Sequence, residues 1–275
     1  MAMEPIKTDS ATGILYRRWQ AASPQAVLLL VHGLGGHSAR WDFLAEYFLR
    51  HNISSYAIEL KGFGETKGLR GHIDSFKIYY NDIRSLHRII RGDNPDKKVL
   101  ILGESMGGLM AFIMAITDAD LFSGCICLVP AFASVMKFSI SEYIKIFSSL
   151  AYNPRKQFVM PFTSQMCTQD VEYQKIMDTD TAREHRLATS GLLINIATEQ
   201  IRALVLKNKL QIPVLFQIAG KDTLVSAQAS KNVFRGLTLK EKELIEYPDM
   251  LHAISIELNR KTAFDDILKW IQKRI

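Results

Sequence analysis

The stretch that most constrains this chain of 275 residues is GESMGG, which places Ser105 between glycines where two apolar runs meet. The run KVLILG before it is typical of a buried strand, and the run from Met106 onward has the length of a helix. G-x-S-x-G between a strand and a helix is typical of a tight turn that exposes one reactive hydroxyl. The alternative is a serine that caps a helix. We favour the reactive serine, because a strained turn is worth keeping only if the hydroxyl must stand exposed.

Short apolar runs alternate with helical stretches along most of the chain. The expected strands lie near residues 13–19, 26–31, 54–59, 98–103, 124–129, 213–219 and 242–247. The expected helices lie near residues 39–51, 75–91, 106–118, 227–235 and 262–274. This alternation predicts an α/β fold with a mostly parallel central sheet flanked by helices on both faces.

Amphipathic helical patches replace this alternation between residues 131 and 205. We therefore predict a core formed by residues 1–130 and 206–275, with a helical cap inserted at 131–205. Helices inserted there would cover the carboxyl ends of the strands, where open α/β sheets bind ligands.

A serine hydroxyl is a weak nucleophile at neutral pH, so the pattern requires a general base. His252, in YPDMLHAIS, lies between the last predicted strand and the last helix, in a loop that opens at the same sheet end as Ser105. Asp222, just beyond the preceding strand, is the predicted acid that orients the imidazole. Asp249 is the alternative acid, but it lies only three residues from His252 in a Pro-Asp turn.

The negative charge that develops when a serine attacks a carbonyl requires backbone N–H donors. One is predicted at Met106, because the first N–H groups of a helix have no intrahelical acceptor. The other is predicted at Leu34 in HGLGGH, where Gly33 and Gly35 would let the backbone approach a substrate closely. A phosphate loop is disfavoured, because the spacing G-x-x-x-x-G-K-[ST] is missing.

Composition argues against several classes of protein. The net charge of +6 comes from scattered charges without a basic stripe, so we expect no nucleic-acid partner. The longest clean apolar run, 26–31, is too short to span a bilayer, and the amino terminus lacks the pattern of a secretory signal. We expect a cytoplasmic protein that can be peripheral at membranes. Cys125, Cys127 and Cys167 are expected to be structural, and neither a metal nor a cofactor is expected.

Together these motifs resemble the α/β-hydrolase superfamily, and within it the monoacylglycerol lipase and lysophospholipase-like branch. The segments that carry the resemblance are VHGLGGHSARWDFLAEYF, ELKGFGETKGLRGHIDSF, GESMGG, GKDTLV and YPDMLHAIS. The resemblance implies Ser105 as nucleophile, Asp222 as acid and His252 as base, with Leu34 and Met106 as oxyanion donors. The chain departs from the branch at two positions: Glu59 stands where aspartate is usual, and Thr66 where serine is usual.

The resemblance implies a serine hydrolase that cleaves carboxylic esters, as a monoacylglycerol lipase or lysophospholipase, through an acyl-enzyme. Apolar residues and methionines of the predicted cap would form an acyl tunnel, and the cap would contact a membrane surface transiently. The predicted substrate-binding residues are Gly33, Gly35, Glu104, Phe132, Met136 and Ile140. The alternatives are a soluble carboxylesterase, peptidase or carbon–carbon bond hydrolase of the same fold, and a non-catalytic ligand-binding scaffold. The oligomeric state is left open.

Overall fold

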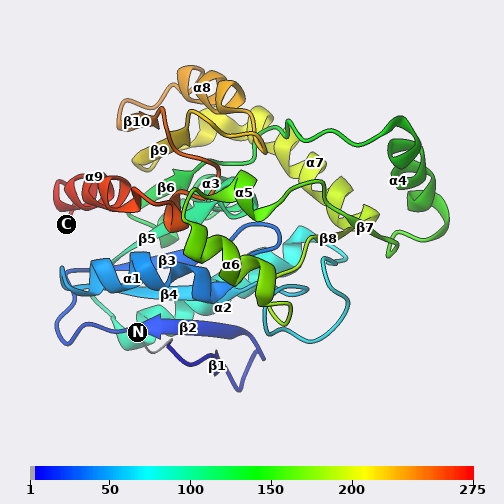
Figure 1. Cartoon of the computed structure of the whole chain (residues 1–275). Coiled ribbons are helices and arrows are strands. Elements are labelled where there is room, and N and C mark those ends of the chain that lie inside the picture. Colours follow the sequence, from blue (N-terminus) through cyan, green and yellow to red (C-terminus); the bar gives the residue numbers. More distant parts are fainter. Residues whose placement is uncertain (1–3) are drawn as a thin grey trace.

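An eight-stranded sheet runs through the computed structural model, which describes residues 4–275 (Figure 1). The strand order is β1-β2-β4-β3-β5-β6-β9-β10. The strands are β1 (Lys7–Thr8), β2 (Leu15–Trp19), β3 (Ala26–Val31), β4 (Ile53–Glu59), β5 (Lys98–Glu104), β6 (Gly124–Leu128), β9 (Val214–Ala219) and β10 (Lys242–Tyr247). β2 pairs antiparallel with β1 and β4, and every other pair of neighbours is parallel. The predicted mostly parallel sheet is confirmed.

Helices cover both faces of this sheet. α1 (Asp42–Leu49) and α9 (Arg260–Gln272) pack on one face; α2 (Phe76–Asp93), α3 (Met106–Thr117) and α8 (Ala227–Arg235) pack on the other. The strand β3 is buried along its whole length and supplies both cores, because its side chains alternate between the faces. Leu28 and Leu30 join the α1 and α9 side, whereas Val27 and Leu29 join the α2 and α3 side.

The predicted strands and helices are found at the expected places, with ends that shift by about two residues. The expected helix 39–51 begins as a short 3-10 helix, η1 (Ser38–Trp41), which leads directly into α1. Further 3-10 turns are η2 (Ala119–Leu121), η3 (Lys207–Lys209) and η4 (Ile254–Ile256). β1 was not predicted, because two residues are too few to give a strand pattern.

The interval of the predicted cap joins β6 to β9. It holds α4 (Ile140–Tyr152), β7 (Gln157–Val159), α5 (Ser164–Cys167), α6 (Val171–Thr179), β8 (Leu187–Thr189) and α7 (Ser190–Leu206). β7 and β8 pair as a small antiparallel ribbon, which the sequence analysis did not anticipate because each strand has three residues. α7 packs against α3 and α4, while α4 stands out at the edge of the molecule (Figure 1).

The three cysteines are buried free thiols, as expected for structural residues. Within residues 4–275, none of the helices combines the length and the apolar character needed to cross a membrane.

The turn between β5 and α3 is a tight junction. Ser105 adopts φ 58° and ψ −119°, a left-handed conformation that is costly for a residue with a side chain. A Cβ at Gly103 would lie 2.1 Å from the carbonyl oxygen of Gly107, and a Cβ at Gly107 would lie 2.0 Å from that of Val31. Both glycines are therefore required for the strand, the turn and the helix to approach one another.

Substituting these glycines tests the close approach. Gly103→Ala should lower the free energy of unfolding by about 2 kcal/mol or more, because the backbone of α3 would have to move. Gly92→Ala is the matched control: Gly92 lies inside α2 with nothing near its would-be Cβ, so alanine should stabilise by roughly 0.5–1 kcal/mol. Urea unfolding measures both changes. A Gly103→Ala protein as stable as the wild type would contradict the account.

Candidate active site

Ser105 lies at the amino terminus of α3, at the carboxyl end of β5. Its backbone is fixed by β6 and the segment that follows it: the Ser105 N–H donates to the Leu128 carbonyl at 3.0 Å, and the Ser105 carbonyl accepts from the Ala131 N–H at 3.0 Å. The side chain faces a cavity of about 330 Å³. The positive end of the α3 dipole lies beside it, which favours a negative charge at this position.

His252 and Asp222 come together at the same cavity. The imidazole Nδ1 lies 2.8 Å from Asp222 Oδ2, and His252 lines the cavity together with Ser105. Asp222 Oδ1 accepts from the N–H groups of Leu224 and Val225 at 2.8 and 3.0 Å, so the carboxylate is held in place. Because Nδ1 is engaged with Asp222, Nε2 is the nitrogen that can take a proton from a serine.

Burial and the mutual charges set the protonation of this pair. Burial alone would lower the pKa of His252, but the charge of Asp222 and its hydrogen bond raise the pKa above the ordinary value. Burial alone would raise the pKa of Asp222, but the charge of His252 and its hydrogen bond hold it below the ordinary value. The alternative acid, Asp249, is 83% exposed at its side chain and pairs with Lys221 instead.

The glycine-rich loop after β3 packs directly against the serine. A Cβ at Gly33 would lie 3.0 Å from the Ser105 Cβ and 3.5 Å from its Oγ, so the loop backbone and the hydroxyl are close neighbours. Leu34 and Met106 both line the cavity. Gly35 has φ 79°, and a Cβ there would lie 2.8 Å from the His185 carbonyl of the predicted cap. The loop is thus held between the nucleophile turn and the cap.

His32, at the start of this loop, is a structural residue rather than a base. Its Nδ1 lies 2.9 Å from the Gly33 carbonyl, and its Nε2 accepts from the Leu60 N–H at 3.1 Å. Burial lowers its pKa to about 3, so the imidazole is neutral at physiological pH. This neutral ring joins the end of β3 to the end of β4.

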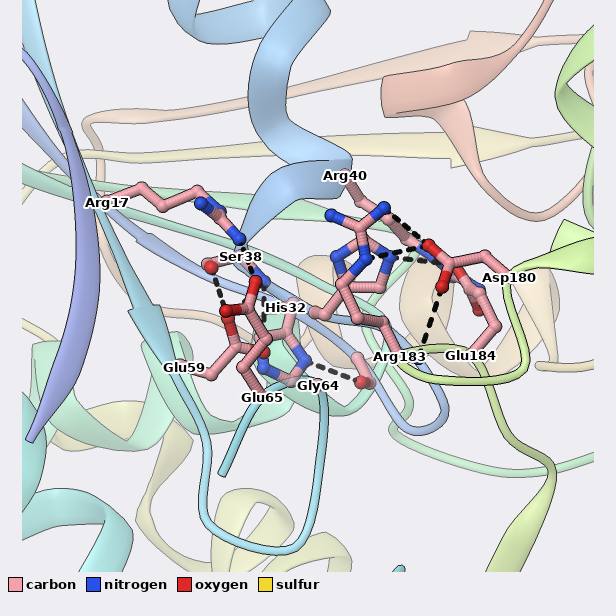
Figure 2. A network of polar contacts seen from close by, with 12 residues as sticks. Arg17, His32, Ser38, Arg40, Glu59, Gly64, Glu65, Asp180, Arg183 and Glu184 are labelled. Carbon is pink, nitrogen blue, oxygen red and sulfur yellow. Dashed lines mark hydrogen bonds and ion pairs between the residues drawn. The ribbon is translucent and has the colours of Figure 1, made fainter. Parts of the chain in front are cut away.

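Two buried glutamates contact the end of the glycine-rich loop and the η1 helix that follows it (Figure 2). One comes from the core and one from the predicted cap. Glu59, at the end of β4, accepts from the Ser38 hydroxyl. Glu184 accepts from Arg40 Nε at 2.8 Å and lies 3.1 Å from His37 Nε2. Sequence reasoning noted Glu59 only as a departure from the branch and missed Glu184, because an isolated glutamate in a cap carries no motif.

These two carboxyl groups have opposite pKa shifts. Burial alone would raise the pKa of Glu184, but the charge of Arg40 and the hydrogen bonds from His37 and Arg40 lower it to about 2. Burial raises the pKa of Glu59 to about 7, against the opposing hydrogen bond from Ser38. Glu184 is therefore a buried anion paired with a buried cation.

The predicted substrate-binding residues divide into two groups. Gly33, Glu104 and Met136 line the cavity. The other three do not, which corrects the prediction: Phe132 packs against Phe112 and Phe216 in the core, Gly35 packs against His185, and Ile140 is 81% exposed at the start of α4. Ile140 does not line the cavity because of its angular position on α4, where other residues of the helix face inward.

Residues of the interval 131–205 supply most of the apolar wall. The cavity-lining side chains of α4 and of the segment after it include Ile146, Phe147, Leu150, Met160 and Phe162. Sequence reasoning missed the contribution of α7, from which Leu193, Ile196, Ala197 and Gln200 line the cavity. Their spacing of three and four residues was the available signal, because it marks one face of a helix.

Between residues 4 and 275, no group of three or more His, Cys, Asp or Glu side chains is arranged to hold a metal ion.

The Glu184 contacts make a testable contribution to stability. Glu184→Gln should lower the free energy of unfolding by about 3–5 kcal/mol, because it leaves the Arg40 charge buried without a partner. Since the folded-state pKa of about 2 lies below the ordinary value of 4.5, this contribution is complete above pH 4.5 and is lost as the pH falls toward 2.

Chemical denaturation of both proteins from pH 7 to pH 3 measures this difference. The matched control is Glu172→Gln in α6, whose side chain is 79% exposed and pairs with Lys175; it should change stability by less than about 0.5 kcal/mol. Equal losses in the two variants would contradict a special role for Glu184.

Comparison with known proteins places this geometry in a family. The sequence profile of the family described as serine aminopeptidase, S33, matches residues 22–259. Monoacylglycerol lipase of Mycolicibacterium smegmatis is 24% identical over 264 residues, which cover 94% of this chain and 92% of that protein. The monoacylglycerol lipase structure of Paleococcus ferrophilus superposes with a TM-score of 0.85 at 22% identity, covering 95% of this chain and 99% of that one.

A soluble variant of monoglyceride lipase from Saccharomyces cerevisiae, solved with a substrate analog, has a TM-score of 0.88 at 18% identity and covers 100% of this chain and 96% of that one. These likenesses confirm the expected α/β-hydrolase fold and the resemblance to the monoacylglycerol-lipase-like branch. Because the profile spans most of the sequence, the chain belongs to the serine aminopeptidase S33 family of α/β-hydrolases.

Proposed function

We propose that this protein is a serine hydrolase that cleaves carboxylic esters of acyl chains, with Ser105 as nucleophile, His252 as general base and Asp222 as the orienting acid. The observation that carries the proposal is the 2.8 Å contact between His252 Nδ1 and Asp222 at a cavity that also contains Ser105. Membership of the S33 family supports it. A base oriented by a carboxylate and a serine in strained backbone geometry serve acyl transfer.

In the first step, His252 Nε2 takes the proton of Ser105 as its Oγ forms a bond to the ester carbonyl carbon. The oxyanion is stabilised by the N–H groups of Leu34 and Met106, which are fixed by the fold before the substrate arrives. The carbon–oxygen bond of the ester then breaks, and the alcohol leaves with the proton from His252. The acyl group remains on Ser105.

In the second step, His252 takes a proton from water, and the resulting hydroxide attacks the acyl-enzyme carbonyl. The bond to Ser105 Oγ breaks, the serine recovers its proton from His252, and the fatty acid leaves. Asp222 stabilises the imidazolium form of His252 in both steps, which agrees with the raised pKa of His252.

The cavity wall favours an acyl chain. Most of its lining comes from apolar side chains of α4, α7 and the connecting segments, and each buried methylene contributes about 0.8 kcal/mol to binding. The relatives named monoacylglycerol lipase support a monoacylglycerol as the substrate. We therefore propose the interval 131–205 as the cap that forms the acyl site.

The outer face of this cap is proposed to contact a membrane surface. Ile140, Ile144 and Tyr152 on α4 are 81%, 63% and 64% exposed, and the exposed Lys137 and Lys145 are close to them in sequence. An exposed apolar helix face with lysines around it suits the boundary between anionic headgroups and acyl chains. Such a contact would deliver lipid substrates to the cavity of a protein that is otherwise cytoplasmic.

Hydrolysis of a substrate panel tests the reaction and its acyl specificity. With 4-nitrophenyl esters from acetyl to palmitoyl, monoacylglycerols and lysophospholipids, kcat/KM should rise from short to medium or long acyl chains because more methylenes are buried. Ser105→Ala should lose about 10⁶-fold in kcat while remaining folded. A flat or short-chain-only profile would favour the soluble carboxylesterase, and full activity in Ser105→Ala would overturn the mechanism.

The membrane contact is tested separately from the chemistry. Replacing both Ile140 and Ile144 by serine should weaken binding to phosphatidylserine-containing vesicles at least about tenfold, because apolar area is withdrawn from the interface. Hydrolysis of a soluble short-chain ester should stay unchanged, since neither side chain lines the cavity. The matched control is Val205→Ser, 73% exposed at the carboxyl end of α7. Equal binding of all three proteins would exclude docking through α4.

A further inference from the structure

Glu104 makes a direct connection between the nucleophile turn and the loop that carries His252. It is the last residue of β5, next to Ser105, and its side chain is buried. Its Oε1 accepts from the Ser255 N–H at 2.9 Å, and its Oε2 accepts from the Ser255 hydroxyl at 2.8 Å. Glu104 and Ser255 are 151 residues apart in sequence, and Ser255 lies in η4, three residues after His252.

We propose that Glu104 is a positioning residue that acts through His252: it fixes the His252 loop to the strand that carries Ser105 and brings a second carboxylate to the site. This inference rests on the proposed function. It replaces the expectation that Glu104 binds substrate, because both of its oxygens already accept hydrogen bonds from Ser255.

The His252 loop is also held by contacts on two other sides. On the cap side, the Ala253 N–H donates to the Cys167 carbonyl at 2.7 Å. On the carboxyl-terminal side, Glu257 accepts from the Leu251 N–H at 3.0 Å. Neither contact ties the loop to β5, whereas the Glu104 bonds do. Because a misplacement of about 1 Å can cost roughly 100-fold in rate, this tie has a direct effect on proton transfer.

The charge of Glu104 acts on the imidazolium that forms during the reaction. The charged groups that act on His252 are Asp222 after β9, Glu104 at the end of β5 and Arg40 on η1. Both carboxylates raise the pKa of His252, and Arg40 lowers it. The neutral His32 ring and the Cys167 thiol also line the cavity. Burial raises the pKa of Glu104 itself, against the opposing hydrogen bonds from Ser255 and the charges of His252 and Arg40. In its anionic form, Glu104 offsets the nearby Arg40 cation and adds to the stabilisation that Asp222 provides.

Two variants separate the charge of Glu104 from its contacts. Glu104→Gln keeps the shape: its carbonyl oxygen can accept from the Ser255 N–H, and its amide can donate to the Ser255 hydroxyl oxygen, so the charge alone is lost. Ser255→Ala removes one hydrogen bond and keeps the charge. Each variant is compared with the wild type by kcat, KM, melting temperature and the pH dependence of kcat/KM.

Glu104→Gln should lower kcat about tenfold with KM unchanged, and it should move the acidic limb of kcat/KM to lower pH by about half a unit or more. The sign follows because losing a negative charge lowers the pKa of His252. Ser255→Ala should lower kcat by about threefold or more through looser positioning and leave the acidic limb in place. A change confined to KM would restore the substrate-binding role, and unchanged kcat in both variants would overturn the proposal.

Titration of His252 by NMR provides a readout that needs no substrate. The pKa of His252 should fall in Glu104→Gln and stay at the wild-type value in Ser255→Ala. An equal pKa in wild type and Glu104→Gln would overturn the charge role, whether or not any ester is hydrolysed. Failure of the proposed function has a different signature: the wild type would cleave no ester, while the His252 titration would still respond to Glu104→Gln.

Discussion

The left-handed backbone at Ser105 is the constraint on which the rest of the site depends. A serine in this conformation persists only if its surroundings fix it, and they do so with the close approach of Gly103 to Gly107 and with backbone bonds to Leu128 and Ala131. A second left-handed residue, Val129 with φ 39°, lies in the same segment. Strain is therefore concentrated at the carboxyl ends of β5 and β6, where the hydroxyl has to face the cavity.

Two further loops are brought to this turn by buried carboxylates. Glu104 joins the His252 loop to the nucleophile turn, and Glu59 and Glu184 hold the loop after β3. Buried carboxyl groups of this kind add little net stability against apolar replacements, but they impose one geometry because each must find its partners. The site is thus assembled from distant parts of the chain by polar contacts inside an otherwise apolar core.

The interval 131–205 takes part in this assembly as well as in forming the cavity wall. Glu184 contacts the loop after β3, and the Cys167 carbonyl accepts from Ala253 beside His252. The face of the interval near the catalytic loops is tied down by these bonds. In contrast, α4 lies at the edge of the molecule (Figure 1), and much of its apolar surface is exposed. Segments that differ in this way in buried contacts are expected to differ in local stability.

Periodic features of the sequence predicted much of this architecture. The strands could be placed from apolar runs and turns, and the order of Ser105, Asp222 and His252 followed from loops at one end of a parallel sheet. Contacts between single side chains give no periodic pattern in the sequence, so they could not be predicted. Glu184 belongs to no motif, and Ser255 ends the segment YPDMLHAIS, which does not indicate its partner Glu104. The three-residue strands β7 and β8 are too short to show a period. The exposed position of Ile140 depended on the phase of α4 against its neighbours, which tertiary packing decides.

The central claim is that Ser105 is a nucleophile activated by His252. Reaction with a fluorophosphonate probe, followed by mass spectrometry of the labelled peptides, tests it most directly. The account predicts one adduct, on Ser105, in the wild type and a rate of labelling that falls at least about 100-fold in His252→Ala. Absence of an adduct on Ser105, or labelling at an undiminished rate without the imidazole, would contradict it.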